Sequence, residues 1–265
     1  MAIEPHNEKA AATWGSGGAG YDLISETIAD SIEHLLNRLD VQPGERVLDL
    51  ATGTGWTARR LAQKGAKVTG VDIGKGVIDA AKRFAKAAKL NIEFLVGDAE
   101  KVDLPSGAFD VISSTCGVMF ASQPEAVAKE LGRLCRHGGR IGLTTWAPTS
   151  TIFQLFQVMR PYMPPPPSPA PPSPFEWGKR ERVHQLLGAD FDLKFESGVS
   201  MLRMPSSERV WKVFSEGYGP TKALHQAIDR KEDLRRDFIA LHDKYRTELG
   251  VAMPPDYLIV IGTRR

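Results

Sequence analysis

The feature that most limits the fold of this chain is a regular alternation of short apolar runs and helical patterns over its first 150 residues. Each apolar run has the length of a strand and ends in turn residues, and amphipathic segments separate the runs. This alternation predicts βαβ units and a parallel sheet with helices on both faces. The expected strands are residues 46–51, 67–73, 91–97, 109–115 and 140–146, followed later by 191–201 and a final run at 256–265.

The first expected strand leads into a glycine-rich segment, VLDLATGTGWTA, at residues 47–58. Gly53, Gly55 and Ala58 match the G-x-G-x-x-A spacing of dinucleotide-binding loops. Glycines at these positions allow a tight turn and a close approach of the backbone to a ligand, and the following helix directs its amides at that ligand. Several nucleotide-like cofactors need the same backbone, so the glycines alone leave the ligand open.

Three carboxylates near the ends of successive strands narrow the choice. Asp49 precedes the glycine turn, where its charge would oppose a pyrophosphate but would suit an ammonium group. Asp72 ends the second strand, where a carboxylate can accept both hydroxyls of an adenosine ribose. Asp98 follows the third strand and can accept from an adenine amino group, while the Ala99 amide can reach a ring nitrogen. A ligand with an amino acid, a ribose and an adenine, and no phosphate, fits all three; S-adenosylmethionine is such a ligand.

Five segments in order resemble the successive motifs of the class I S-adenosylmethionine-dependent methyltransferases: VLDLATGTGW, VTGVDI, GDAEKVDLP, FDVISSTCGVMF and RHGGRIGLTTW. The resemblance is closest to the small-molecule branch that includes ubiquinone and menaquinone biosynthesis enzymes. It is strong over residues 14–146 and looser elsewhere. It implies an α/β fold, a Rossmann-like doubly wound sheet of seven strands that is mixed because the last strand is antiparallel, with helical cap insertions.

The same resemblance implies a set of cofactor-binding residues. Asp49 would face the methionine amino group, directly or through water, and Thr52 and Gly53 would line the methionine moiety. Asp72 would hold the ribose, and Asp98 would read the adenine edge. The full expected set is Trp14, Tyr21, Asp49, Ala51, Thr52, Gly53, Gly55, Asp72, Ile73, Asp98, Ala99, Glu100 and Cys116.

The resemblance and the hydrophobic pattern together predict that the chain is divided into four regions. Residues 1–45 are expected to form an N-terminal lid and helix, in which WGSGGAGYD has the glycine content of a lid that orders on binding, and an amphipathic helix is expected from Asp22 to Leu39. Residues 46–146 would form the cofactor-binding core. Residues 147–190 would hold a proline-rich insertion and a helix of a substrate cap, and residues 191–265 would supply strand six, a helical cap insertion and the closing strand. The proline-rich stretch 161–174 is interpreted as a stiff connector.

Methyl transfer from a sulfonium is an in-line displacement, so the protein mainly aligns the nucleophile and excludes water. A base is needed only if the nucleophile starts protonated. His184, Tyr218 and His225 are candidates for such a base, and Glu216 is a fourth. Aromatic residues outside the core, among them Trp146 and Phe156, suggest an apolar or aromatic acceptor, although they could equally be the core of a cap.

Composition excludes several other classes. The chain has 34 basic and 32 acidic residues, so its charge gives no footprint for nucleic acid. Its two cysteines suggest neither a disulfide framework nor a metal site. The polar start and the lack of a long apolar run favour a cytoplasmic protein without a membrane segment. A homodimer, the identity of the acceptor and the atom methylated remain open at this stage. An NAD(P)-dependent oxidoreductase and a non-catalytic S-adenosylmethionine-binding module are the alternatives.

Overall fold

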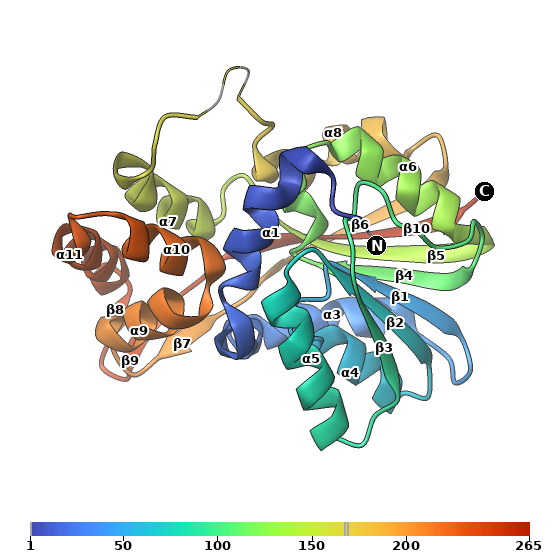
Figure 1. Cartoon of the computed structure of the whole chain (residues 1–265), viewed down its shortest axis with the longest axis horizontal. Helices are drawn as coiled ribbons and strands as arrows, with labels where there is room; N and C mark the ends of the chain where they lie inside the picture. Colours follow the sequence, from blue (N-terminus) through green and yellow to red (C-terminus); the bar gives the residue numbers. More distant parts are fainter. Residues whose placement is uncertain (1, 167, 169) are drawn as a thin grey trace.

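A computed structural model describes residues 2–166, 168 and 170–265, and its centre is a seven-stranded mixed sheet (Figure 1). The strand order is β3-β2-β1-β4-β5-β10-β6, and only β10 runs antiparallel to its neighbours. The predicted fold class is therefore confirmed, and the last strand lies inside the sheet rather than at its edge. The strands are β1 (Arg46–Leu50), β2 (Lys67–Asp72), β3 (Ile92–Val96), β4 (Phe109–Thr115), β5 (Cys135–Trp146), β6 (Phe191–Val199) and β10 (Asp256–Arg264).

Helices cover both faces of this sheet, as the alternating pattern predicts (Figure 1). One face carries α3 (Ala29–Leu39), α4 (Trp56–Gln63) and α5 (Lys75–Ala87). The other face carries α6 (Pro124–Leu134) and α8 (Arg180–Leu187). One hydrophobic core joins both faces to the sheet, with fully buried side chains such as Leu35, Leu48 and Ile112.

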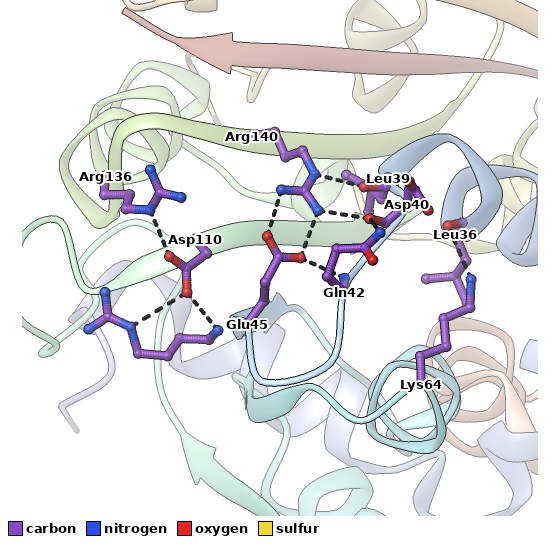
Figure 2. Close-up of polar contacts among 10 residues, drawn as sticks. Leu36, Leu39, Asp40, Gln42, Glu45, Lys64, Asp110, Arg136 and Arg140 are labelled. Carbon is purple, nitrogen blue, oxygen red and sulfur yellow. Dashed lines mark hydrogen bonds and ion pairs between the residues drawn. The ribbon is translucent and has the colours of Figure 1, made fainter.

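Arg140, near the amino end of β5, fastens the end of α3 to the sheet (Figure 2). Its guanidinium donates to the Leu39 and Asp40 carbonyls at 2.7 and 3.0 Å and pairs with both oxygens of Glu45 at 2.8 and 2.7 Å. The carbonyls at a helix end lack partners within the helix, so a cation there satisfies them and complements the helix dipole. These contacts of Arg140 with Leu39, Asp40 and Glu45, which we call the clamp, hold the end of α3 to the sheet. They lie at the edge opposite the carboxyl ends of β1 to β4.

The N-terminal segment is divided into more short helices than the sequence predicts. It contains η1 (Pro5–Asn7), α1 (Glu8–Gly15), η2 (Gly18–Gly20) and α2 (Tyr21–Glu26) before α3 begins. The expected single helix from Asp22 to Leu39 is wrong, because the chain turns at Thr27 and Ile28 between α2 and α3. In Figure 1, α1 crosses in front of the sheet.

A second layer, which we call the cap, lies beside the sheet and has its own hydrophobic core (Figure 1). The expected helical stretch from Ser206 is confirmed over most of its length, but the chain then forms short strands that the sequence does not reveal. The cap consists of α7 (Thr151–Met159), α9 (Ser207–Gly217), α10 (Gly219–Ala227), α11 (Lys231–Asp243), and the three-stranded sheet of β7 (Leu202–Met204), β8 (Arg246–Thr247) and β9 (Gly250–Met253).

The proline-rich stretch 161–174 joins α7 to η5 (Pro174–Gly178). Its prolines at positions 167 and 169 lie outside the described residues, and the described remainder from Met163 to Ser173 is exposed. At its two ends Tyr162 and Phe175 are buried, and the Tyr162 hydroxyl donates to Asp237 at 2.5 Å. Within the described part of the chain, no helix has the length and apolarity needed to cross a membrane.

Candidate functional site

A pocket with an empty volume of about 1010 Å³ lies at the carboxyl ends of β1 to β4. Its floor comes from the turns that follow the strands, and its wall comes from the N-terminal segment. The expected residues that line it are Trp14, Tyr21, Ala51, Thr52, Gly53, Asp72, Ile73, Asp98, Ala99, Glu100 and Cys116.

The glycine turn after β1 shapes the floor of this pocket. Gly53 and Gly55 have φ of +56° and +75°, the left-handed region that glycine enters without strain. Gly55 does not line the pocket; a Cβ there would lie 2.7 Å from the Phe94 ring, so this glycine lets the turn pack against the sheet behind it. Ala51 and Cys116 also have positive φ, at 56° and 52°. Such strain at two non-glycine residues is typical of functional sites.

Asp49 is buried behind the turn and does not line the pocket. Its carboxylate accepts from the Thr52 hydroxyl at 2.6 Å and from the Ser113 hydroxyl at 2.8 Å. Burial raises the pKa of Asp49 to about 6, although the two hydroxyls oppose the shift. Of its two hydroxyl partners, Thr52 lines the pocket, so Thr52 and not Asp49 would make the direct contact with a ligand.

Asp72 lines the pocket at the end of β2 and also holds two turns together. Its carboxylate accepts from the Gly53 amide and from the Gly74 amide, each at 2.8 Å. Each carboxylate oxygen can accept more than one hydrogen bond, so capacity remains for ligand hydroxyls. Burial raises the pKa of Asp72, and the two amides lower it in part.

Asp98 lies where the N-terminal segment meets the turn after β3. Its carboxylate accepts from the Glu100 amide at 3.0 Å, the Glu4 amide at 3.2 Å and the Asn7 side-chain amide at 2.9 Å. Glu100 in turn pairs with His6 at 2.7 Å. The residues expected to read an adenine edge therefore also hold the N-terminal segment over the pocket.

Two aromatic residues of the N-terminal segment complete the wall. The Tyr21 ring lies over the glycine turn, with Cε1 3.2 Å from the position that a Cβ of Gly53 would take. Trp14 packs on Tyr21 and, with ring centroids 5.0 Å apart, on Phe120. Tyr218 from the cap joins this cluster, 5.6 Å from Trp14 and stacked on Tyr21 at 6.4 Å. Burial raises the pKa values of both tyrosines and of the Cys116 thiol, so all three stay protonated near neutral pH.

The structure does not bring the histidine candidates for a base to the pocket. His184 is exposed and packs on Phe195 at 5.1 Å, and His225 packs on Trp211 at 5.1 Å within the cap. Tyr218 contacts the aromatic wall but does not line the pocket, and neither does Glu216. Of the aromatic residues expected around an acceptor, Trp146 belongs to the hydrophobic core of the sheet and Phe156 packs against it. Neither lines the pocket.

The sequence analysis missed a group of lining residues on the N-terminal helices and beside the strand ends. Asn7, Ala10 and Trp14 share one face of α1, and their spacing of three and four residues was a signal that could have revealed that helix. Others lie next to residues that were identified. They are Ile24, Ser25, Ile28, Ile32, Leu50, Trp56, Thr57, Val71, Val77, Gly97, Thr115, Gly117, Val118, Phe120 and Ala121.

The charge of the pocket is one-sided. Among the described residues that line it are the carboxylates of Asp72, Asp98 and Glu100, and no lysine, arginine or histidine. Within the same described ranges, no group of three His, Cys, Asp or Glu residues is placed to hold a metal ion. A crevice at the carboxyl ends of the strands of a 3-2-1-4-5 sheet is where doubly wound α/β proteins bind nucleotide-like ligands. The fold and the pocket thus define a protein of that class.

Comparisons with known proteins identify the family within this class. A family model described as a methyltransferase domain matches residues 47–139. An uncharacterized protein of Mycobacterium tuberculosis is 30% identical over 261 residues, which cover 96% of this chain and 93% of the relative. A malonyl-acyl-carrier-protein O-methyltransferase of Serratia marcescens is 36% identical over 54% of this chain and 55% of its own length. A demethylmenaquinone methyltransferase of Beutenbergia cavernae is 29% identical over 58% and 65%.

Solved structures agree on the fold. The YcgJ protein of Bacillus subtilis superposes with a TM-score of 0.62 and 18% identity, over 89% of this chain and 99% of that one. A phosphoethanolamine N-methyltransferase of Haemonchus contortus in complex with S-adenosylmethionine has a TM-score of 0.57 and 15% identity, over 89% and 52%. The chain belongs to the class I S-adenosylmethionine-dependent methyltransferases, as its motifs predict, and it is an enzyme of that family.

Proposed function

We propose that this enzyme binds S-adenosylmethionine in the pocket and transfers its methyl group to an oxygen, nitrogen or carbon atom of a small apolar or aromatic molecule. The observation that carries the proposal is the charge of the lining: three carboxylates and, among the described lining residues, no cation. S-Adenosylmethionine has a net positive charge from its sulfonium and ammonium groups. A dinucleotide brings two phosphates, which this lining would repel.

Different lining residues would contact different parts of such a ligand. Asp72 would accept the ribose hydroxyls, and Asp98 with Ala99 would meet the adenine. The Thr52 hydroxyl donates to Asp49, so its oxygen would be the acceptor for the methionine ammonium. The ring of Tyr21, which lies over Gly53, is placed to face a sulfonium, because aromatic faces attract cations.

The cofactor supplies an activated methyl group, so the remaining work of the chain is alignment and exclusion of water. An aromatic cluster of Trp14, Tyr21, Phe120 and Tyr218 lies between the glycine turn and the cap, and it would form the apolar surface next to the methyl group. Protonated phenols there can donate hydrogen bonds but are poor bases. We therefore expect an acceptor whose nucleophilic atom needs no deprotonation by the enzyme, such as a neutral amine or an enolate, and which is otherwise apolar. The Beutenbergia cavernae relative is named for demethylmenaquinone, and an apolar ring of that kind would suit these aromatic side chains.

Calorimetry with a set of related ligands tests this proposal. S-Adenosylhomocysteine lacks the positive charge of the sulfonium, whereas sinefungin places an ammonium group near the same position. We expect sinefungin to bind about 3- to 10-fold more tightly than S-adenosylhomocysteine, the scale of an exposed to partly buried cation–π contact, and NAD not to bind. Binding of NAD in the absence of S-adenosylhomocysteine binding would overturn the assignment.

A further inference from the structure

Glycines from three separate parts of the chain meet where the N-terminal segment passes between the core and the cap. We call this meeting the glycine seam: Gly15, Gly17 and Gly20 of the N-terminal segment, Gly74 and Gly76 at the start of α5, and Gly217 and Gly219 on either side of Tyr218. Apart from Gly15 and Gly20, each of them faces the backbone of another segment at a distance that leaves no room for a methyl group, and a Cβ on Gly20 would be in tight contact with Gly217.

On the core side, the end of α1 lies directly on the first turn of α5. A Cβ on Gly74 would be 2.8 Å from the Gly15 nitrogen and 2.9 Å from its Cα, and a Cβ on Gly76 would overlap the Gly15 carbonyl oxygen. The α5 turn follows Asp72 and Ile73, which line the pocket. The N-terminal segment is therefore seated on the part of the core expected to hold the ribose.

On the cap side, the same segment lies on the joint between α9 and α10. A Cβ on Gly219 would overlap the Thr13 carbonyl oxygen and lie 3.0 Å from the Trp14 Cα, and a Cβ on Gly217 would overlap the Gly20 carbonyl oxygen. Hydrogen bonds add to this contact, because Lys222 donates to the Ser16 carbonyl at 2.7 Å. Neither Gly217 nor Gly219 lines the pocket.

The segment held in the seam is also the wall of the pocket. Ala10 and Trp14 line the pocket from α1, and Asn7, which precedes α1, lines it and donates a hydrogen bond to Asp98. A ligand lying between the strand ends and α1 would contact Ala10 and Trp14, so a shift of α1 would open or narrow the pocket on that side. In the seam, backbone packs directly on backbone, so no flexible side chain lies between the two segments to absorb a movement. We therefore expect a shift of α1 to displace the α9–α10 joint as well.

We propose that the glycine seam couples the N-terminal wall to the cap, so that the position of the α9–α10 joint controls entry and exit of the cofactor. The inference rests on the proposed function and adds a regulation of the same site. An acceptor that contacts the cap beside Tyr218 would hold the joint in place and keep the wall closed. Cofactor would then bind before the acceptor and leave after the methylated product.

Two substitutions in the cap test the coupling without an acceptor. Gly219→Ala and Gly217→Ala add one methyl group at the joint, at backbone angles that alanine can adopt, and they leave every lining residue intact. We expect hydrogen exchange of residues 4–20 to accelerate at least 10-fold in both variants, while exchange in β1, β4 and α11 stays as in the parent chain. We also expect S-adenosylhomocysteine to bind at least 10-fold more weakly and to dissociate faster, with intrinsic tryptophan fluorescence as the readout, since Trp14 and Trp56 line the pocket.

Gly15→Ala is the matched control. It lies in the seam itself, but its added Cβ would be 3.5 Å from its nearest neighbours, which is ordinary contact. Exchange and binding should therefore match the parent protein. Gly76→Ala, which adds its methyl group on the core side, should loosen residues 4–20 as the cap variants do.

Three results would contradict the coupling: unchanged exchange of residues 4–20 in Gly217→Ala and Gly219→Ala, an equal effect of Gly15→Ala, or faster exchange throughout α9–α11. If the parent protein fails to bind S-adenosylhomocysteine but the exchange pattern holds, the proposed cofactor is wrong and the coupling stands. The two proposals therefore fail separately.

Discussion

Asp49 shows how a single buried carboxylate can shape the site without touching the pocket. Its oxygens are taken by the Thr52 and Ser113 hydroxyls, and burial raises its pKa to about 6. A dinucleotide or methionine ligand would meet Thr52 rather than Asp49. When it is ionised, Asp49 places a negative charge behind the glycine turn. Burying that charge lowers the free energy of unfolding of the unliganded protein.

The pH dependence of stability should reveal this cost. Because the pKa of Asp49 is raised in the folded state, the stabilising proton is fully present below about pH 4 and is lost as pH rises through about 6. We expect Asp49→Asn to gain stability relative to the parent chain between pH 4 and pH 7, by up to about 3 kcal/mol. Urea unfolding of both proteins across this range measures the difference. A difference that is constant with pH would show that Asp49 keeps an ordinary pKa.

Asp72 is expected to act on the ligand directly. Replacing it by asparagine keeps one acceptor oxygen for the turns but removes the charge that would receive the ribose hydroxyls. We expect Asp72→Asn to weaken S-adenosylhomocysteine binding by about 1–3 kcal/mol, the cost of losing hydrogen bonds to a charged acceptor. Asp79→Asn is the control, because Asp79 is a half-exposed carboxylate of α5 that pairs with Lys75 and does not line the pocket. Calorimetry showing equal affinities for Asp72→Asn and the control would remove Asp72 from the site.

Individual residues were predictable from the sequence where strand ends fix their position. Asp72 and Asp98 follow parallel strands, so their side chains must meet at one edge of the sheet. Asp49 was harder, because nothing in the sequence shows that Ser113 on the neighbouring strand would supply its second hydroxyl. The contacts of Asn7 with Asp98 join residues more than ninety positions apart, and no local pattern indicates them.

At the scale of elements, the core strands and helices were predictable because their hydrophobic periods are regular. The helix α1 was missed because it is short, alanine-rich and has no fully buried residue. The small sheet of β7, β8 and β9 was missed because strands of two to four residues carry too little periodicity to detect. The break between α2 and α3 carries neither proline nor glycine, so tertiary contacts decide it.

The clamp at the end of α3 offers a test of element packing (Figure 2). Arg140→Met would leave the Glu45 carboxylate and the Leu39 and Asp40 carbonyls without their cation. We expect a loss of about 2–3 kcal/mol in the free energy of unfolding, with S-adenosylhomocysteine affinity unchanged because the clamp is at the opposite edge of the sheet. Arg136→Met should cost less than about 1 kcal/mol, because the Arg136 side chain is exposed and Asp110 also accepts from the Arg46 amide. Equal losses in urea unfolding would show that the helix-end contacts contribute nothing.

At the scale of the whole molecule, two hydrophobic cores are joined through the N-terminal segment. That segment contacts the sheet domain at α5 and the cap at α9 and α10, so the pocket lies where three parts of the chain meet (Figure 1). Neither the meeting nor the seam could be derived from the sequence, since the glycines involved are separated by up to two hundred positions. Only the presence of a glycine-rich lid and of a helical cap was foreseeable.

Ligand binding should therefore stabilise the whole molecule rather than the core alone. At a concentration of 100 times its dissociation constant, a ligand adds about 2.7 kcal/mol to the free energy of unfolding. For a chain of this size, we expect S-adenosylhomocysteine to raise the melting temperature by about 5–10 °C. Differential scanning calorimetry should show the cap and the core shifting together. A shift confined to one of two separate transitions would mean that the ligand does not bridge the parts.

The one-sided charge of the pocket has a consequence for turnover. Methyl transfer converts a cofactor of net positive charge into a zwitterion of zero net charge, so the reaction itself weakens the attraction that the three carboxylates exert. The pocket thus favours fresh cofactor over spent cofactor at every cycle, and the by-product should compete with fresh cofactor less well than a cationic analogue does.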